Sequence, residues 1–341
     1  MASALALSPT LLPFSRHRRS ILSPAPQNPL LSSIPRPHLL GGGVVSLPLV
    51  PSGRVLWRVR AETPKQEREP MVPPFNVLIT GSTKGIGLAF AKEFLKAGDN
   101  VVVCSRSAER VELTIKQLRE EFGEKHVELS VMLVKERMSR LSLPLHGISS
   151  ITLIYGSTML DLMHTATNHW LKLLTMILFV TTNTIGVMIC CREAINMMLN
   201  QPRGGHIFNI DGAGSDGRPT PRFAAYGATK QSVVHLTKSL QAELQMQDVK
   251  NVMVHNLSPG MVTTDLLMSG ANTKQAKFFI NILAEPPDVV AENLVPSIRS
   301  VPSRQSMRPT YIRFLTGLKA YSQIFSRLAF GARRNRYVIE D

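Results

Sequence analysis

A tyrosine and a lysine four residues apart carry the clearest chemistry in this 341-residue sequence. Tyr226 and Lys230 begin a segment whose apolar residues recur with helical spacing, so both side chains face the same side of a helix. A free tyrosine loses its proton at about pH 10, and a neighbouring ammonium lowers that pKa. The pair therefore predicts proton transfer by Tyr226, assisted by Lys230, which can also bond a nucleotide ribose.

A glycine-rich turn provides a candidate nucleotide site far upstream of this pair. The apolar run 75–80 precedes the turn and a helix-like run at 88–98 follows it, so the turn joins a predicted strand to a predicted helix. Such a turn lets backbone amides approach a pyrophosphate at the helix N-terminus. The predicted cofactor contacts are Gly81, Ser82, Thr83, Lys84, Gly85, Ile86 and Gly87.

The residues after a second predicted strand, 100–104, indicate which cofactor binds there. An acidic residue at this place bonds the adenosine ribose hydroxyls and repels a 2′-phosphate. This sequence has Arg106 beside Ser105, and Lys84 adds a second cation from the turn. Cations beside hydroxyls suit a phosphate, so the pattern favours NADPH, with NADH possible. An ordinary solvated surface residue is the alternative interpretation of Arg106.

The order of these segments predicts the fold that positions them. A helix at 108–122 completes a strand–turn–helix–strand–helix opening, the start of an α/β fold with a doubly wound parallel sheet. We expect a single Rossmann domain. Further strands are predicted at 206–210 and 252–257, and the loop 211–217 leads from the first of them towards Tyr226.

These motifs together resemble the short-chain dehydrogenase/reductase family over roughly residues 75–296. The matching stretches are TGSTKGIG at 80–87, YGATK at 226–230 and the segment that begins at Ser258. The resemblance implies that Asn183 positions a proton-relay water beside the lysine. It also implies nicotinamide contacts from a segment after the strand at 252–257, namely Pro259, Gly260, Val262 and Thr263.

The serine that polarises the substrate carbonyl in that family stands about thirteen residues before the tyrosine. This sequence has Ala213 there, and Ser215 is the nearest hydroxyl in a flexible glycine-rich loop. We therefore assign the role to Ser215, a plain loop serine being the alternative.

The segment 128–180 departs from the family pattern. It lacks the aspartate expected near the end of the third strand and the Asn-Asn-Ala-Gly expected at the end of the fourth. One interpretation is a segment alien to the family, such as translated intron. The other is a divergent middle with strands at 129–134 and 150–155. Residues 173–191 contain no charge, but their threonines and Asn183 predict a buried helix rather than a membrane span.

A closer resemblance comes from residues 188–198 and 207–230, which are similar to the chloroplast chlorophyll(ide) b reductases. It implies reduction of the 7-formyl group of chlorophyll(ide) b to 7-hydroxymethyl chlorophyll(ide) a, the first step of chlorophyll b degradation, with a proton from Tyr226. Two alternatives stay open: a 3-ketoacyl-acyl-carrier-protein reductase, or a non-catalytic partner subunit of an active reductase. The resemblance also implies a homo-oligomer, or a hetero-oligomer with a related reductase.

Composition indicates the location and the appended segments. Residues 1–61 hold seven arginines and no acidic residue, which is typical of a chloroplast transit peptide, and 62–74 reads as a linker before the domain at 75–297. Most of the net charge of +15 lies in the two ends, which argues against a nucleic-acid-binding domain. The three cysteines fit neither disulfides nor a metal site.

The C-terminal segment 298–341 is basic and amphipathic. Its apolar residues from Tyr311 to Leu328 recur at helical spacing, with Arg313, Lys319 and Arg327 near or off the stripe. This pattern indicates either packing on the core or a partner, or peripheral contact with an anionic membrane. A pigment substrate favours the second reading, on the stromal side of the thylakoid.

Overall fold

The computed structural model describes residues 71–131, 151–154, 176–221, 223–269, 271–304 and 308–340. The predicted transit peptide, residues 62–70 of the linker and most of the segment 128–180 lie outside the described residues.

The described part of the chain forms a parallel sheet of seven strands, in the order β3-β2-β1-β4-β5-β6-β7. The order reverses between β1 and β4, the switch point at which doubly wound sheets bind ligands beside the carboxyl ends of their strands. The strands are β1 (Asn76–Thr80), β2 (Asn100–Ser105), β3 (Val127–Val131), β4 (Ile151–Ile154), β5 (Gly205–Ile210), β6 (Val252–Ser258) and β7 (Tyr311–Arg313).

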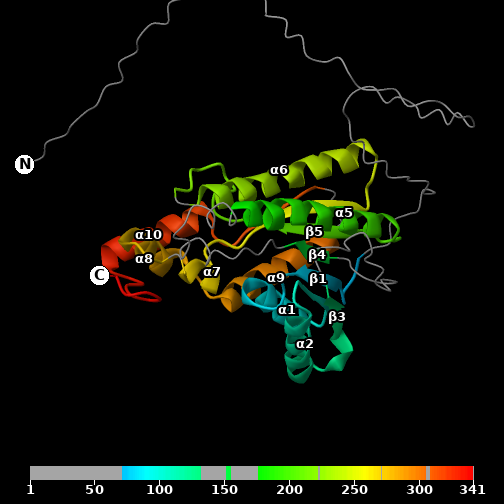
Figure 1. Cartoon of the computed structure of the whole chain (residues 1–341), viewed down its shortest axis with the longest axis horizontal. Helices are drawn as coiled ribbons and strands as arrows, with labels where there is room; N and C mark the ends of the chain where they lie inside the picture. Colours follow the sequence, from blue (N-terminus) through cyan, green and yellow to red (C-terminus); the bar gives the residue numbers. More distant parts are fainter. Residues whose placement is uncertain are drawn as a thin grey trace, which may run out of the picture. The chain divides into compact units, whose positions relative to one another are not determined.

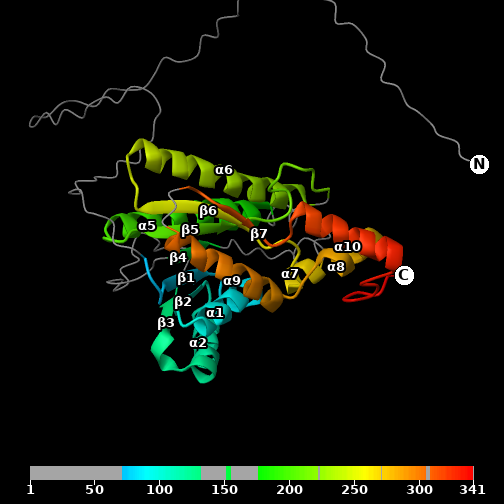
Figure 2. The ribbon, with the colours of Figure 1, turned by 180° about the vertical axis from the view of Figure 1, so that it is seen from behind.

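Helices cover both faces of this sheet, which confirms the predicted doubly wound α/β fold (Figure 1). On one face lie α1 (Gly85–Lys96), α2 (Ala108–Phe122) and α9 (Pro287–Ser303). On the other lie α5 (Gly186–Leu199), which a π-helical turn (Val180–Ile185) precedes, and α6 (Ala224–Met246). The short α7 (Asp265–Met268), α8 (Lys274–Leu283) and α10 (Gly317–Phe330) gather beyond β7, where α10 packs beside α8 (Figure 2).

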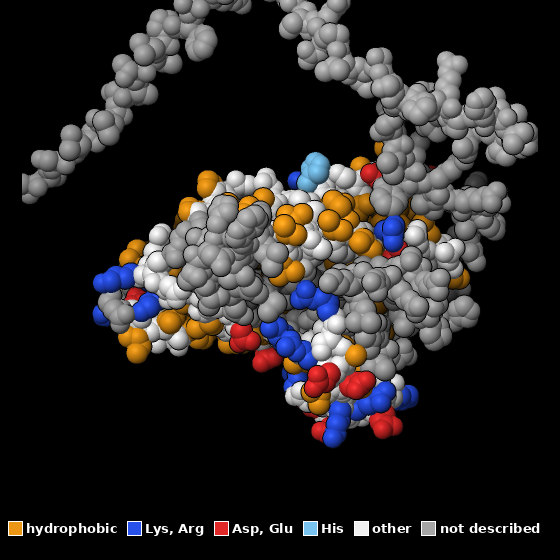
Figure 3. All heavy atoms as spheres, viewed as in Figure 1, with side chains coloured by type: hydrophobic (Ala, Val, Ile, Leu, Met, Phe, Trp, Pro, Cys, Tyr) orange, Lys and Arg blue, Asp and Glu red, His pale blue; other side chains and the backbone are white. Residues whose placement is uncertain are grey.

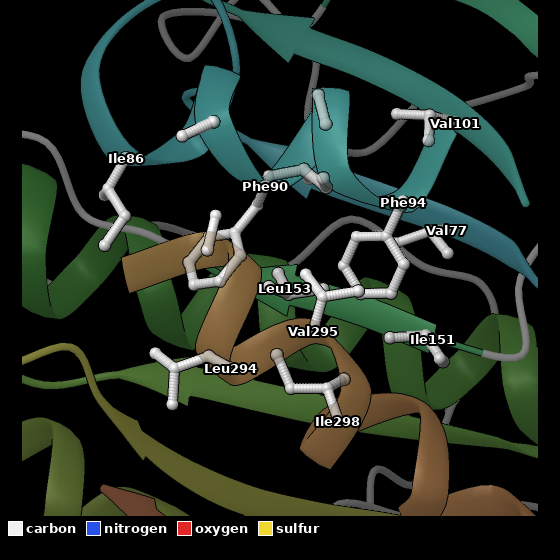
Figure 4. Close-up of a cluster of buried hydrophobic side chains, with 14 of the residues drawn as sticks. Val77, Ile86, Phe90, Phe94, Val101, Ile151, Leu153, Leu294, Val295 and Ile298 are labelled. Carbon is white, nitrogen blue, oxygen red and sulfur yellow. The ribbon is translucent and has the colours of Figure 1, made fainter. Parts of the chain in front are cut away.

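The hydrophobic core between α1, α9 and the sheet fixes the position of the glycine-rich turn. Phe90 and Phe94 of α1 are fully buried and point towards Val295 of α9 and Leu153 of β4 (Figure 4). Removing such a ring leaves a cavity and costs about 3–5 kcal/mol. Because α1 begins at Gly85, this packing also holds the turn at the carboxyl edge of β1.

Two strands come from the atypical segment 128–180. β3 pairs with β2, and β4 lies between β1 and β5, every pair being parallel. Both strands fall close to the predicted 129–134 and 150–155. The register Leu78↔Thr152 places β4 directly beside the strand that enters the glycine-rich turn, so the segment contributes a central strand.

The helix that was predicted to be buried is covered on one side only. Met176–Leu199 is long and apolar enough to cross a membrane by length and composition alone. Its inner side, including Cys191 and Met198, packs on the sheet. Ile177, 55% exposed, and Met188, 44% exposed, lie on the other side, and Figure 3 shows hydrophobic side chains gathered over the region of α5. The prediction was wrong because a sheet covers only one face of each helix that packs on it.

The C-terminal segment is more closely joined to the domain than predicted. The expected boundary at 297 falls inside α9, and β7 extends the sheet by pairing with β6. Phe314 is buried in the main core, so the apolar stripe does not run continuously from Tyr311. The exposed stripe belongs to α10 alone and consists of Leu318, Tyr321, Phe325 and Leu328.

Candidate active site

Tyr226 and Lys230 lie in the first two turns of α6, as their spacing predicts. The Lys230 side chain is almost fully buried, its Nζ donates to the carbonyl of Ile210 at 3.3 Å, and it lies 5.7 Å from the centre of the Tyr226 ring. Burial lowers the pKa of Lys230 to about 8, and the charge of Asp211 opposes that shift. An ammonium held this close favours the tyrosinate form of Tyr226.

Asn183 reaches the start of α6 from the neighbouring π-helical turn, which lies on the same face of the sheet. It is fully buried in the π-helical turn before α5, and its Nδ2 donates to Thr229 Oγ1 at 3.2 Å. Thr229 in turn donates to the carbonyl of Tyr226 at 2.7 Å. Single π-turns inside helices are frequent at functional sites, because they re-aim one side chain. The structure therefore brings Asn183 beside the tyrosine–lysine pair.

Gly212 is the residue whose backbone lies directly against the tyrosine hydroxyl. A Cβ at this position would stand 2.4 Å from Tyr226 Oη and 3.2 Å from Lys230 Cε. Counting residues pointed to Ala213 as the place of the family serine, whereas the residue that the structure shows against the hydroxyl is Gly212. The predicted Ser215 lies further along the loop, where its Oγ donates to Asp211 Oδ2 at 3.2 Å.

Asp211 was missed as a site residue in the sequence. It follows the last residue of β5, is 2% exposed, and accepts hydrogen bonds at Oδ2 from Ser215 and from the Tyr311 hydroxyl. Burial raises its carboxyl pKa, while hydrogen bonds and the charge of Lys230 act in the opposite direction. An aspartate at the carboxyl end of an apolar strand is the signal that could have pointed to it.

The glycine-rich turn has the shape that a pyrophosphate needs. Gly81 and Gly85 have positive φ values of 69° and 56°, and a Cβ on Gly87 would lie 2.5 Å from the carbonyl oxygen of Gly81. Ser82 is buried and ties the turn to both strands, since its Oγ donates to Ile79 and accepts from the amide of Cys104. Lys84 caps α1 without a side-chain bond to the helix amides, which leaves those donors for an anion.

The predicted ribose-phosphate residues adjoin this turn. Thr83 Oγ1 donates to Ser105 Oγ at 3.3 Å, which holds the end of β2 against the turn. Arg106 and Lys84 are both exposed. Two exposed cations beside two hydroxyls can accept a phosphate, so these residues fit a phosphorylated adenosine ribose.

The segment after β6 lies at the same edge of the sheet as the glycine-rich turn. Gly260 has a φ of 72°, the amide of Thr263 donates to the carbonyl of Glu285 at 2.9 Å, and Val262 forms a β-bridge with the same residue. A Cβ on Gly85 would touch Thr264 at 3.4 Å, so this segment lies against the glycine-rich turn. The turn and the segment after β6, the two parts of the predicted cofactor site, therefore meet at one edge of the sheet. Among the described residues no group of three His, Cys, Asp or Glu side chains has metal-site geometry.

A comparison with known proteins identifies relatives of this chain. The family model for short chain dehydrogenase matches residues 76–275. The chain is 59% identical to chlorophyll(ide) b reductase NOL, chloroplastic, of Arabidopsis thaliana over 96% of this chain and 97% of the relative. It is 67% identical to the protein of the same name from Oryza sativa subsp. japonica, over 80% of this chain and 81% of the relative.

A solved structure supports the fold. An NADPH-bound short chain oxidoreductase from Pseudomonas aeruginosa, described as containing an atypical catalytic center, superposes with a TM-score of 0.56 at 21% identity, over 71% of this chain and 96% of that one. The match of the family model and the sheet order agree with the site described above. The chain belongs to the short-chain dehydrogenase family and is an NAD(P)H-dependent oxidoreductase of that family.

Proposed function

We propose that the protein reduces the 7-formyl group of chlorophyll(ide) b to a hydroxymethyl group, giving 7-hydroxymethyl chlorophyll(ide) a in the chloroplast. The observation that carries the proposal is the similarity to two chloroplast chlorophyll(ide) b reductases, one over 96% of the chain, together with the Tyr226–Lys230 pair on α6. This similarity favours the pigment reductase over a ketoacyl reductase.

The chain's own residues supply the proton and hold the substrate carbonyl. A bound nicotinamide cofactor supplies the hydride. Tyr226 gives its proton to the formyl oxygen, and Lys230 stabilises the resulting phenolate. Asn183, through Thr229, fixes the turn that carries the tyrosine and holds a relay water. Ser215 polarises the carbonyl from the loop after β5, its hydroxyl turning from Asp211 to the bound substrate.

We assign NADPH as the preferred cofactor, with NADH possible. Lys84 and Arg106 are exposed cations beside Thr83 and Ser105, and no acidic side chain stands at the end of β2. A charge-assisted bond to the 2′-phosphate adds about 1.5–3 kcal/mol. The nicotinamide end meets the segment 259–263.

The test is reduction of purified chlorophyllide b with NADPH, followed by chromatography of the pigment product. We expect the 7-hydroxymethyl product from the wild-type chain and none from Tyr226→Phe, which keeps the ring and removes the proton. Tyr321→Phe is the matched control, because Tyr321 is 73% exposed on α10. Activity on 3-ketoacyl thioesters alone would support a ketoacyl reductase. Cofactor binding without turnover would support a partner subunit.

We further propose peripheral contact with the stromal side of the thylakoid membrane through the apolar stripe of α10. Its members are 66–83% exposed: Leu318, Tyr321, Phe325 and Leu328. Arg313 and Lys319 flank the stripe, whereas Arg327 is buried and pairs with Glu340, so the cationic share is smaller than the sequence indicated. Flotation with anionic lipid vesicles tests the contact. Phe325→Ser should abolish binding, and binding by this variant equal to wild type would exclude the stripe.

We also propose an oligomer, either of this chain or with a related reductase, through the exposed side of α5. Ile177, Ile185 and Met188 form an apolar face there, of the kind that marks protein–protein contact. Sedimentation of the mature chain measures the state. Met188→Glu should dissociate it, and a monomeric wild type would exclude the homo-oligomer.

A further inference from the structure

The carboxylate of Asp211 occupies a buried position beside the active site for which the proposed mechanism has no use. The backbone amide of Asp211 donates to the carbonyl of Leu257 at 3.0 Å, which fixes the residue at the carboxyl end of β5. The side chain is 2% exposed. An ionised carboxylate taken out of water is costly unless it is paired with a cation and hydrogen bonded, so the surroundings of this group decide its role.

Each element around Asp211 presents a group that stabilises a negative charge. The loop after β5 presents Ser215, and β7 presents the Tyr311 hydroxyl, both as donors to Oδ2. From β6 the hydroxyl of Ser258 acts to lower the pKa of the carboxyl. From α6 the charge of Lys230 acts on it, and Arg313 lies over the Tyr311 ring at 4.1 Å. Asp211 directly precedes Gly212, where a Cβ would lie 3.2 Å from Lys230 Cε, so the carboxylate stands in the neighbourhood of this ammonium.

A negative charge nearby favours the charged form of Lys230. This side chain is 1% exposed, and the hydrogen bond that its Nζ donates to the carbonyl of Ile210 does not neutralise an ammonium. Burial works against the charged form of this lysine, and the charge of Asp211 is the influence that favours it. Because the tyrosine depends on an ammonium beside it, a neutral Lys230 would remove its activation.

We propose that Asp211 is a positioning residue that keeps Lys230 protonated, and that Tyr311 holds its carboxylate in place. The proposal rests on the reductase function proposed above. It concerns the position next to Gly212, the residue whose backbone lies against the tyrosine hydroxyl. Asp211 acts through Lys230 and does not touch the reacting atoms.

The pH dependence of kcat/KM for chlorophyllide b separates this role from a structural one. The negative charge of Asp211 opposes loss of the first proton from the Tyr226–Lys230 pair, whichever of the two gives it up. In Asp211→Asn, a change that keeps the size, the alkaline limb should move to lower pH by about one unit. Tyr311→Phe keeps the charge and should leave the limb in place. Asp216→Asn, a solvent-exposed carboxylate of the same loop, is the matched control.

A limb unmoved in Asp211→Asn, with only the plateau lowered, would overturn the proposal. If that variant does not fold, Asp211→Ser makes the same test. A double-mutant cycle of Asp211→Asn with Lys230→Met, measured by urea unfolding, needs no substrate. The double variant should lose less stability than the two single losses combined, and additive losses would refute the pairing. If the wild-type chain had no reductase activity, the proposed function would be refuted. The double-mutant cycle would still show whether Asp211 and Lys230 interact.

Discussion

A methyl group at position 212 would lie 2.4 Å from the Tyr226 hydroxyl and 3.2 Å from carbons of Lys230. Atoms that are not bonded approach to about 3.5 Å, so Gly212→Ala must move the hydroxyl by about 1 Å. A misplacement of about 1 Å costs on the order of a hundredfold in rate, equivalent to about 2.7 kcal/mol of transition-state stabilisation. We therefore expect kcat for chlorophyllide b reduction to fall about a hundredfold in Gly212→Ala.

The assay is kcat at saturating NADPH, with thermal unfolding followed in parallel. Overpacking costs about 1–3 kcal/mol of stability, so the variant should still be folded at the assay temperature. Gly317→Ala is the matched control, because no atom lies within 4 Å of a Cβ there. If Gly212→Ala keeps kcat within about threefold of wild type, the tyrosine hydroxyl does not depend on a bare backbone and the reasoning fails.

Three further predictions follow from other contacts. Arg106→Asp should raise the KM for NADPH at least about tenfold and lower that for NADH, measured by steady-state kinetics, while Arg110→Asp, an exposed residue of α2, should change neither. Burial lowers the pKa of His255 to about 4, so the stabilisation that its neutral form gives is fully present above about pH 6.5. The free energy of unfolding, measured with urea, should therefore decline by about 2–3 kcal/mol towards pH 4. If His255→Gln leaves this pH dependence unchanged, the prediction is contradicted. Arg299→Ala leaves the buried Asp99 carboxylate without its ion pair and should lower the free energy of unfolding by about 2–3 kcal/mol in the same assay. This value is set below that for a fully buried pair because the arginine is partly exposed. The control Arg304→Ala should change the free energy of unfolding little.

The sequence by itself determined the parts of the site that depend on neighbours along the chain. A positive φ at Gly81 and Gly85 and the close approach at Gly87 are local requirements, which is why the glycine pattern predicts the turn. The spacing of Tyr226 and Lys230 fixes a common helix face. The alternation of apolar runs with helical periods predicts the doubly wound sheet.

Only the tertiary structure decided which side chains from distant segments meet. Asp211 and Tyr311 are 100 residues apart, and the sheet register joins them: Asn209 pairs with Asn256, which pairs with Tyr311. Asp211 stands two residues beyond Asn209 on the same face of β5. Likewise the path of the loop after β5 brought Gly212 to the tyrosine hydroxyl. Strand register and loop path depend on the whole core, so neighbouring residues along the chain do not encode them.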